Sequence, residues 1–236
     1  MYNIFGQISH KGELKKMAQR IKGVIFDMDG LMLDTEKLLT RFWCEAAAFY
    51  GFDMQSQQVL GIRSLAAKYA QVHLKGIFGE DFDYYAVRAK RIELMNAYIA
   101  KNGIEKKQGL DELLESLSQR GLKLAVATAT DRQRTDMYLT KAGVLHYFDA
   151  LVTGDTIANG KPKPDIYIAA AKALGLPCEQ CLALEDSPNG IRSAYDAHCK
   201  AVMIPDLSLP DEQIKPLLYA CYSSLSELEK DIDVLL

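Results

Sequence analysis

Short apolar runs alternate along the chain with longer stretches in which apolar residues recur at helical spacing. The runs contain almost no polar positions, which is typical of strands that are covered on both faces of a parallel sheet. Helical patterns lie between them at residues 109–120, 131–142, 164–174 and 188–197. This alternation predicts βαβ units and a doubly wound, Rossmann-like α/β fold. The predicted strands are Gly23–Phe26, Leu122–Thr128, Ala150–Thr153, Cys181–Leu184 and Ala201–Ile204.

The alternation is interrupted after the first strand, because no strand-like run occurs between about residues 34 and 103. Amphipathic helical patterns fill this interval, and its length is enough for a small second domain. Ligands of open α/β sheets bind beyond the carboxyl ends of the strands, so an insertion here would cover the site. We therefore predict an α/β core of residues 22–33 and 104–236, an inserted α-helical cap domain of residues 34–103 and an N-terminal extension of residues 1–21.

Composition narrows the class of protein. The chain has 236 residues with 28 Lys and Arg against 31 Asp and Glu, a net charge of −3. That balance does not indicate nucleic-acid binding, which usually needs a basic domain. No apolar run approaches the ~18 residues of a membrane span, and the charged first sixteen residues do not resemble a secretory signal. We expect a cytoplasmic protein without nucleic-acid or membrane partners; the sequence indicates no oligomeric state.

The five cysteines are scattered and odd in number, which indicates reduced thiols. Cys178 and Cys181 form one C-x-x-C pair. A zinc site would need a second pair or paired histidines, and a redox pair usually opens a helix, whereas this one leads into an apolar run. We interpret the pair as structural.

The first predicted strand ends in two closely spaced carboxylates, Asp27 and Asp29, followed by Gly30. Unpaired carboxylates beside an apolar core are costly. A hard cation such as Mg²⁺ would relieve that cost, since it favours carboxylate, phosphate and water oxygens. The spacing alone is a weak signal, because Asp81 and Asp83 show it without a preceding strand.

Three other strand ends carry matching polar residues. The second run ends at Thr128, and the third is followed by Lys161 between Gly160 and Pro162. The fourth ends in the acidic pair Glu185 and Asp186, just before a Ser-Pro helix start. Strands of a parallel sheet place these ends at one edge, so the side chains are expected to converge although they span about 160 residues of sequence.

The order of these motifs, D-x-D-G, a strand-final Thr, G-K-P-x-P-D and E-D-S-x-x-G, resembles the haloacid dehalogenase-like superfamily of phosphotransferases. The resemblance covers about residues 22–209. Within this superfamily, the sequence is most similar to the branch of sugar-phosphate phosphatases and β-phosphoglucomutases that carry a helical cap. The resemblance implies a Mg²⁺-dependent phosphatase that hydrolyses a small phosphorylated metabolite, a sugar phosphate or a nucleoside monophosphate, through an aspartyl-phosphate intermediate.

The resemblance also implies roles for individual residues. Asp27 would be the nucleophile and Asp29 the general acid and base. Thr128 and the amide of Ala129 would bind phosphoryl oxygens, and Lys161 would offset the negative charge of nucleophile and phosphate. These five residues form the expected catalytic and phosphate-binding set.

The same resemblance assigns the metal ligands and a cap residue. Mg²⁺ would be held by Asp27, the backbone carbonyl of Asp29, and Asp186, with Glu185 binding directly or through water. Arg63, in the segment Gly61-Ile-Arg-Ser64, matches the specificity loop of the cap and would bind a substrate anion or hydroxyl.

Mutases of this branch carry a His shortly after the first motif and a Lys on the cap. The His position falls at about Leu39, and the cap Lys position falls near Asn96. The missing His favours hydrolysis, and a β-phosphoglucomutase-like mutase is the alternative. A non-catalytic phosphate-ester-binding protein would also keep the fold, whereas a dinucleotide-binding enzyme would need a G-x-G-x-x-G after the first strand.

Overall fold

A computed structural model describes residues 20–236, and the expected N-terminal extension lies almost wholly outside this range. The described residues form a six-stranded, all-parallel sheet in the order β3-β2-β1-β4-β5-β6. Five strands coincide with the predicted apolar runs to within one residue at each end, and the two-residue β6 was not predicted. The strands are β1 (Gly23–Phe26), β2 (Lys123–Thr128), β3 (Ala150–Thr153), β4 (Cys181–Glu185), β5 (Lys200–Met203) and β6 (Ala220–Cys221).

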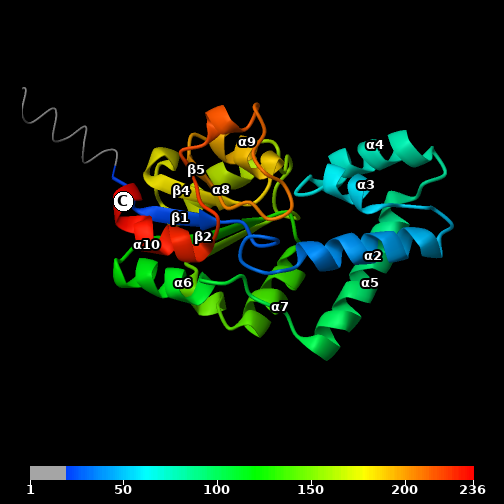
Figure 1. Cartoon of the computed structure of the whole chain (residues 1–236), viewed down its shortest axis with the longest axis horizontal. Helices are drawn as coiled ribbons and strands as arrows, with labels where there is room; N and C mark the ends of the chain where they lie inside the picture. The colour runs from blue at the N-terminus through cyan, green and yellow to red at the C-terminus, as the bar shows by residue number, and fades with distance from the viewer. Residues whose placement is uncertain (1–19) are drawn as a thin grey trace, which may run out of the picture.

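Helices cover both faces of this sheet (Figure 1). Alternate strand residues pack toward opposite layers, so that Phe26 and Val126 face one side while Ile25 and Ala125 face the other. The predicted doubly wound Rossmann-like fold is therefore confirmed. One face is covered by α6 (Leu110–Gln119), α7 (Arg132–Ala142) and α10 (Leu225–Leu235), and the other by α8 (Asp165–Leu174) and α9 (Pro188–Asp196).

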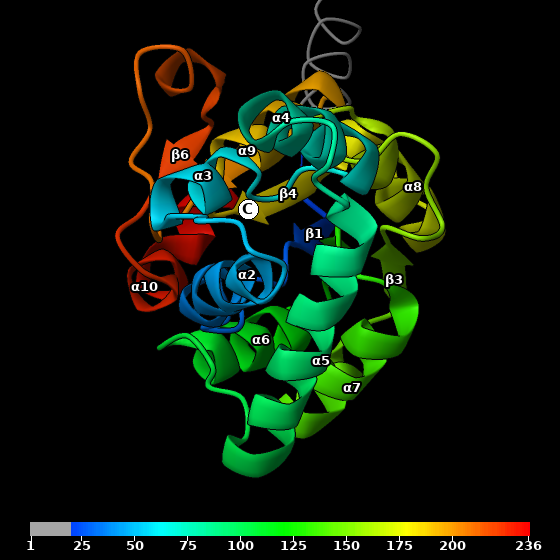
Figure 2. The ribbon, with the colours of Figure 1, turned by 90° about the vertical axis from the view of Figure 1, so that its right-hand side faces the viewer.

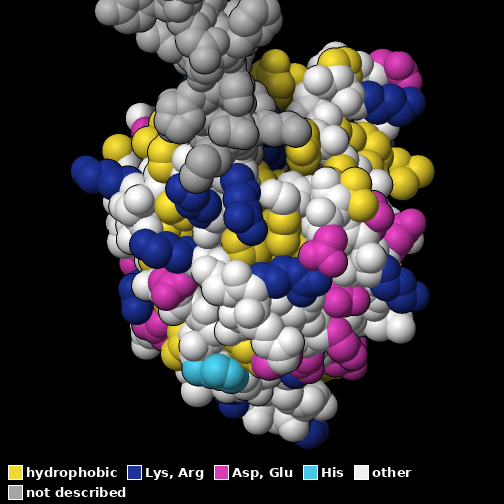
Figure 3. Space-filling view, turned by 90° about the vertical axis from the view of Figure 1, so that its left-hand side faces the viewer, with side chains coloured by type: hydrophobic (Ala, Val, Ile, Leu, Met, Phe, Trp, Pro, Cys, Tyr) yellow, Lys and Arg dark blue, Asp and Glu magenta, His cyan; other side chains and the backbone are white. Residues whose placement is uncertain are grey.

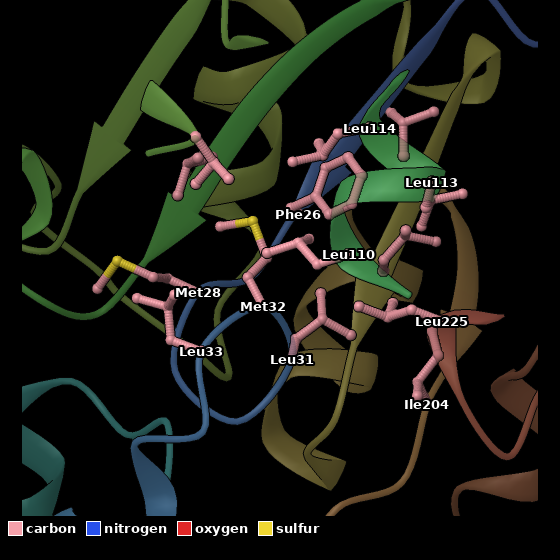
Figure 4. Packing of buried hydrophobic residues seen from close by; sticks show 14 of the residues in the cluster. Phe26, Met28, Leu31, Met32, Leu33, Leu110, Leu113, Leu114, Ile204 and Leu225 are labelled. Atoms are coloured by element: carbon pink, nitrogen blue, oxygen red, sulfur yellow. The ribbon is translucent and has the colours of Figure 1, made fainter. Parts of the chain in front are cut away.

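The loop after β1 is fixed by its own apolar side chains. Met28, Leu31, Met32 and Leu33 are all buried and pack with Phe26, α6 and Leu225 (Figure 4). Burying each of these side chains contributes about 1.5–3 kcal/mol. The two aspartates of the D-x-D-G motif are thereby carried on an anchored segment.

The interval between β1 and α6 is helical, as predicted. Its four helices, here called the helical cap, lie beside the carboxyl ends of the strands (Figures 1 and 2). They enclose a separate apolar cluster around Trp43, Leu74 and Phe82. The N-terminal half of the first cap helix and the C-terminal half of the last contribute side chains to the main core instead. The cap helices are α2 (Glu36–Phe49), α3 (Ser56–Gly61), α4 (Ala67–Phe78) and α5 (Tyr84–Asn102).

Hydrogen bonds join the cap to the core around the site. The Ala66 amide donates to the carbonyl of Lys161 at 3.1 Å. Asn189 Nδ2 donates to the carbonyl of Arg63 at 3.0 Å, and Lys68 Nζ donates to the carbonyl of Ala158 at 3.0 Å. The cap is therefore closed onto the strand ends.

The end of the molecule away from the cap carries Lys and Arg side chains interspersed with Asp and Glu (Figure 3). A surface of mixed sign does not attract a polyanion strongly. Within residues 20–236, none of the helices combines the length and the apolar character of a membrane span.

Candidate active site

The structure brings the strand-end residues of the sequence together at one edge of the sheet. Phe26 pairs with Val126 on one side and Leu184 on the other, so the residues that follow β1 lie between the ends of β2 and β4. Asp27, Asp29, Thr128 and Lys161 line one cavity of about 330 Å³, which also contacts the cap. That volume is at the lower end of the range for small-molecule sites.

Lys161 is the electrostatic centre of this edge. Its fully buried ammonium lies 2.6 Å from Asp27 Oδ1 and 2.6 Å from Glu185 Oε1. The Tyr167 hydroxyl donates to the same Glu185 oxygen at 2.7 Å. Burial lowers the pKa of Lys161, but the two carboxylates outweigh this effect and raise it, so the lysine is a permanent cation.

Asp27 carries a perturbed carboxyl group. Burial raises its pKa to about 7; Lys161 acts in the opposite direction, and the negative charges of Glu185 and Asp29 raise it further. Added positive charge at this position would keep the carboxylate ionised. A further cation beside Asp27 would therefore favour its ionised form at neutral pH.

Three carboxylates form a compact group that fits a metal ion. Single oxygens of Asp27, Glu185 and Asp186 all lie within 4.8 Å of one another, and all three residues are buried. Both carboxylate oxygens of Asp186 lack a hydrogen-bond partner within the described part of the chain. Burial raises the pKa of Asp186 well above its usual value. Buried oxygens without donors are what a hard cation such as Mg²⁺ would bind.

Asp29 is held apart from this group. Its two carboxylate oxygens accept hydrogen bonds from Thr35 Oγ1 and Thr130 Oγ1, both at 2.7 Å. Gly30 adopts φ +85°, and a Cβ there would overlap the Asp186 carboxylate, so only glycine suits the turn. The tight turn separates the Asp29 side chain from the three clustered carboxylates.

Thr128 and Ala129 lie where β2 gives way to α7. Thr128 is buried, and its Oγ1 accepts a hydrogen bond from the Thr130 amide at 3.1 Å. Asp131 caps α7 by accepting from the Arg134 amide. Both Thr128 and Ala129 line the cavity, next to the N-terminal turn of a helix.

Arg63 reaches the site from the cap, but it contacts the acidic group. Its Nη2 donates to the carbonyl of Asp186 at 2.7 Å and lies 3.4 Å from Asp186 Oδ2. Its Nε and Nη1 atoms have no hydrogen-bond partner within residues 20–236. Arg63 also lines the cavity, and its role toward substrate remains a prediction.

Several charged residues to which sequence reasoning gave no role also line the cavity, among them one glutamate and three arginines. Glu36 is buried, and burial raises its pKa to about 8 against the opposing charge of Arg63. In the sequence, its position directly after Asp34 and Thr35 is the one feature that could have indicated a place near the site. The other three are arginines of the cap and of α7: Arg88, Arg91 and Arg134.

Comparison with known proteins agrees with this geometry. The sequence model of the haloacid dehalogenase-like hydrolases matches residues 24–204. The fructose-1-phosphate phosphatase YqaB of Escherichia coli is 30% identical over 187 residues, which cover 79% of this chain and 97% of that protein. The phosphorylated carbohydrates phosphatase of Thermotoga maritima is 29% identical over 221 residues, which cover 91% of this chain and 98% of that protein.

Similarity also extends to a longer protein and to solved structures. SUPPRESSOR OF QUENCHING 1, a chloroplastic protein of Arabidopsis thaliana, is 32% identical over 189 residues, which cover 78% of this chain but 18% of that protein. The crystal structure of CbbY from Rhodobacter sphaeroides in complex with phosphate superimposes with a TM-score of 0.76 and 28% identity, over 88% of this chain and 96% of that chain.

Proposed function

This chain belongs to the haloacid dehalogenase-like hydrolases, in the branch that resembles β-phosphoglucomutase, and we propose that it is a Mg²⁺-dependent phosphatase of small phosphorylated metabolites. The observation that carries the proposal is the buried Lys161 ammonium, 2.6 Å from the Asp27 carboxylate, beside two further buried acids. Phosphoryl transfer depends chiefly on in-line positioning and charge compensation, and the charged residues at this edge of the sheet support the second of these. We assign residues 34–103 to the cap and residues 22–33 and 104–236 to the catalytic core.

In the first step, an Asp27 oxygen attacks the phosphorus atom and the ester oxygen leaves with its electron pair. Asp29 gives this oxygen a proton, so an alcohol is released and an aspartyl-phosphate remains on Asp27. Asp29 then takes a proton from water, whose oxygen attacks the same phosphorus atom and restores the Asp27 carboxylate. Thr35 and Thr130 hold the Asp29 carboxylate in one orientation for both proton transfers.

The phosphoryl oxygens would be bound by Thr128, the Ala129 amide and Lys161. The Mg²⁺ ligands would be Asp27, Asp186 and the backbone carbonyl of Asp29, with Glu185 direct or through water. When bound, the ion supplies positive charge that keeps Asp27 ionised and neutralises the phosphate. Asp186 fits this role because its buried oxygens accept no hydrogen bond within the described residues, and the Arg63 guanidinium lies 3.4 Å from one of them.

The relatives support a sugar phosphate as the substrate. Two of them are named for fructose 1-phosphate and for phosphorylated carbohydrates. A cavity of about 330 Å³ suits a ligand of this size.

Mutase activity is less supported than hydrolysis. Leu39 lines the cavity where mutases of this branch have a His, and an apolar side chain cannot transfer a proton. Asn96, near the expected cap Lys position, accepts a hydrogen bond from the Tyr138 hydroxyl at 3.3 Å.

The nucleophile assignment is tested with Asp27→Asn, which keeps the shape of the side chain. We expect it to abolish phosphate release from p-nitrophenyl phosphate in Mg²⁺, because an amide oxygen is a poor nucleophile. Asp81→Asn, the same change at an exposed position, is the matched control and should retain full activity. Wild-type turnover by Asp27→Asn would refute the assignment.

A further inference from the structure

The cavity has a second charged region, formed by two helices that are distant in sequence. Arg88 and Arg91 lie three residues apart on one face of α5 in the cap, and Arg134 lies on α7 of the core. All three line the cavity that contains Asp27. We call them the arginine cluster.

Arg91 is the unusual member, because it is buried without an acidic partner. Arg91 is 5% exposed, and among residues 20–236 its Nε has no hydrogen-bond partner. Its Nη1 donates to the sulfur of Met95 at 3.9 Å, and the guanidinium lies 5.4 Å from the Trp43 ring centroid. Within residues 20–236, no Asp or Glu lies within ion-pair distance of Arg91.

The neighbouring charges leave the cluster with an excess of positive charge. Asp131 is its acidic member, and this carboxylate is already bound by the Nε and the amide of Arg134. Burial lowers the pKa of Arg91 to about 9, and the nearby Arg134 and Arg88 add to this effect. Arg134 thus occupies the one carboxylate that the cluster binds, whereas the buried Arg91 forms no ion pair within residues 20–236, and a buried cation is costly unless it is paired.

Asp29, the proposed proton donor to the ester oxygen, lines the same cavity as the arginine cluster. The phosphoryl group would bind at Asp27, so the alcohol part of a substrate would fill the rest of this cavity, whose lining includes the three arginines. Arg63 does not belong to this region, because it binds Asp186.

We propose that the arginine cluster binds a second anionic group, a phosphoryl or a carboxylate group, on the alcohol part of the substrate. The preferred substrate is then a small phosphate ester with two anionic groups. This inference rests on the proposed phosphatase function. Arginine suits the role because its planar guanidinium forms paired hydrogen bonds with either group.

The test compares esters that differ mainly in the second anion. Fructose 1-phosphate and fructose 1,6-bisphosphate form the phosphoryl pair, and glycerol 2-phosphate and 2-phosphoglycerate form the carboxylate pair. We expect kcat/KM for the doubly anionic member of at least one pair to be higher by about 10- to 100-fold, the range for hydrogen bonds to a charged group. The pair that shows the preference identifies the second anion.

Two variants then locate the preference. Arg91→Met keeps an unbranched apolar stem, and Arg88→Gln removes the charge of a half-buried residue. Each should reduce the ratio of kcat/KM within the preferred pair by about tenfold. Lys101→Gln removes a positive charge from an exposed position of the same helix, and should leave the ratio unchanged.

Two results would overturn the inference while leaving the phosphatase function intact: a preference below about threefold in both pairs, or equal losses on both members of a pair in the folded variants. Failure of the proposed function would look different. The folded wild-type protein would then release no phosphate from any of these esters or from p-nitrophenyl phosphate, and the inference would fall with it.

Discussion

Replacing Lys161 by methionine should destabilise the metal-free protein by about 3–5 kcal/mol, the cost of removing one partner from a buried ion pair. Methionine keeps an unbranched stem of similar length, so the change removes mainly the charge. Two carboxylates lose their partner at once, because the ammonium lies 2.6 Å from both Asp27 and Glu185. Glu185 keeps the Tyr167 hydroxyl and the Asp186 amide as donors.

The magnitude can be assigned to the pair by a double-mutant cycle. If the cost arises from the unpaired Asp27 carboxylate, Asp27→Asn should cost about 1.5–3 kcal/mol less in the Lys161→Met background than in the wild type. Tyr167→Phe serves as the comparison, because it removes a donor to Glu185 but leaves the Lys161 and Asp27 pair in place.

The assay is urea unfolding in EDTA, followed by circular dichroism. At about 3 kcal/mol per molar urea, the Lys161→Met midpoint should fall by about 1–2 M. If the effects of Lys161→Met and Asp27→Asn add to within about 0.5 kcal/mol, the ion pair does not carry the stability and the reasoning is refuted.

Three further predictions follow from the same geometry. Gly190→Ala should destabilise the protein by about 1–3 kcal/mol in thermal unfolding, because its Cβ would overlap the Glu185 carboxylate. Gly76→Ala is the control: it lies in a helix with open space around it, and should stabilise the protein by about 0.5–1 kcal/mol in the same measurement. Iodoacetamide at pH 7.5 should modify Cys178 before Cys221 in peptide mapping, since a hydrogen bond from Cys199 lowers the Cys178 pKa to about 7 whereas burial raises that of Cys221; the reverse order would contradict this. EDTA should abolish phosphatase activity and Mg²⁺ should restore it, and activity that persists in EDTA would exclude the proposed metal dependence.

The sequence was sufficient to predict the sheet and the convergence of its strand ends. Strands buried on both faces leave uninterrupted apolar runs, and parallel pairing then places Asp27, Thr128 and Glu185 at neighbouring strand ends. The two-residue β6 was missed because so short a strand carries no periodicity.

The cap side of the site could not be predicted in the same way. Helical spacing shows that Arg88 and Arg91 share a face, but the docking of α5 on the core decides what that face meets. The contact of Arg63 with Asp186 joins residues 123 positions apart, between the helical cap and the core. Tertiary contacts of this kind have no local signal in the pattern of the chain.

One contact between cap and core offers a direct measure of how often the site opens. The Ala66 amide donates to the carbonyl of Lys161 and would lose this bond if the cap moved away from the core. The Ala70 amide, four residues on, donates to the carbonyl of Ala66 within the cap itself. Comparing the hydrogen-exchange rate of the Ala66 amide with that of the Ala70 amide therefore reports how often the cap separates from the core, and no added label is needed. A ligand that holds the cap closed should slow exchange at Ala66 while leaving Ala70 nearly unchanged.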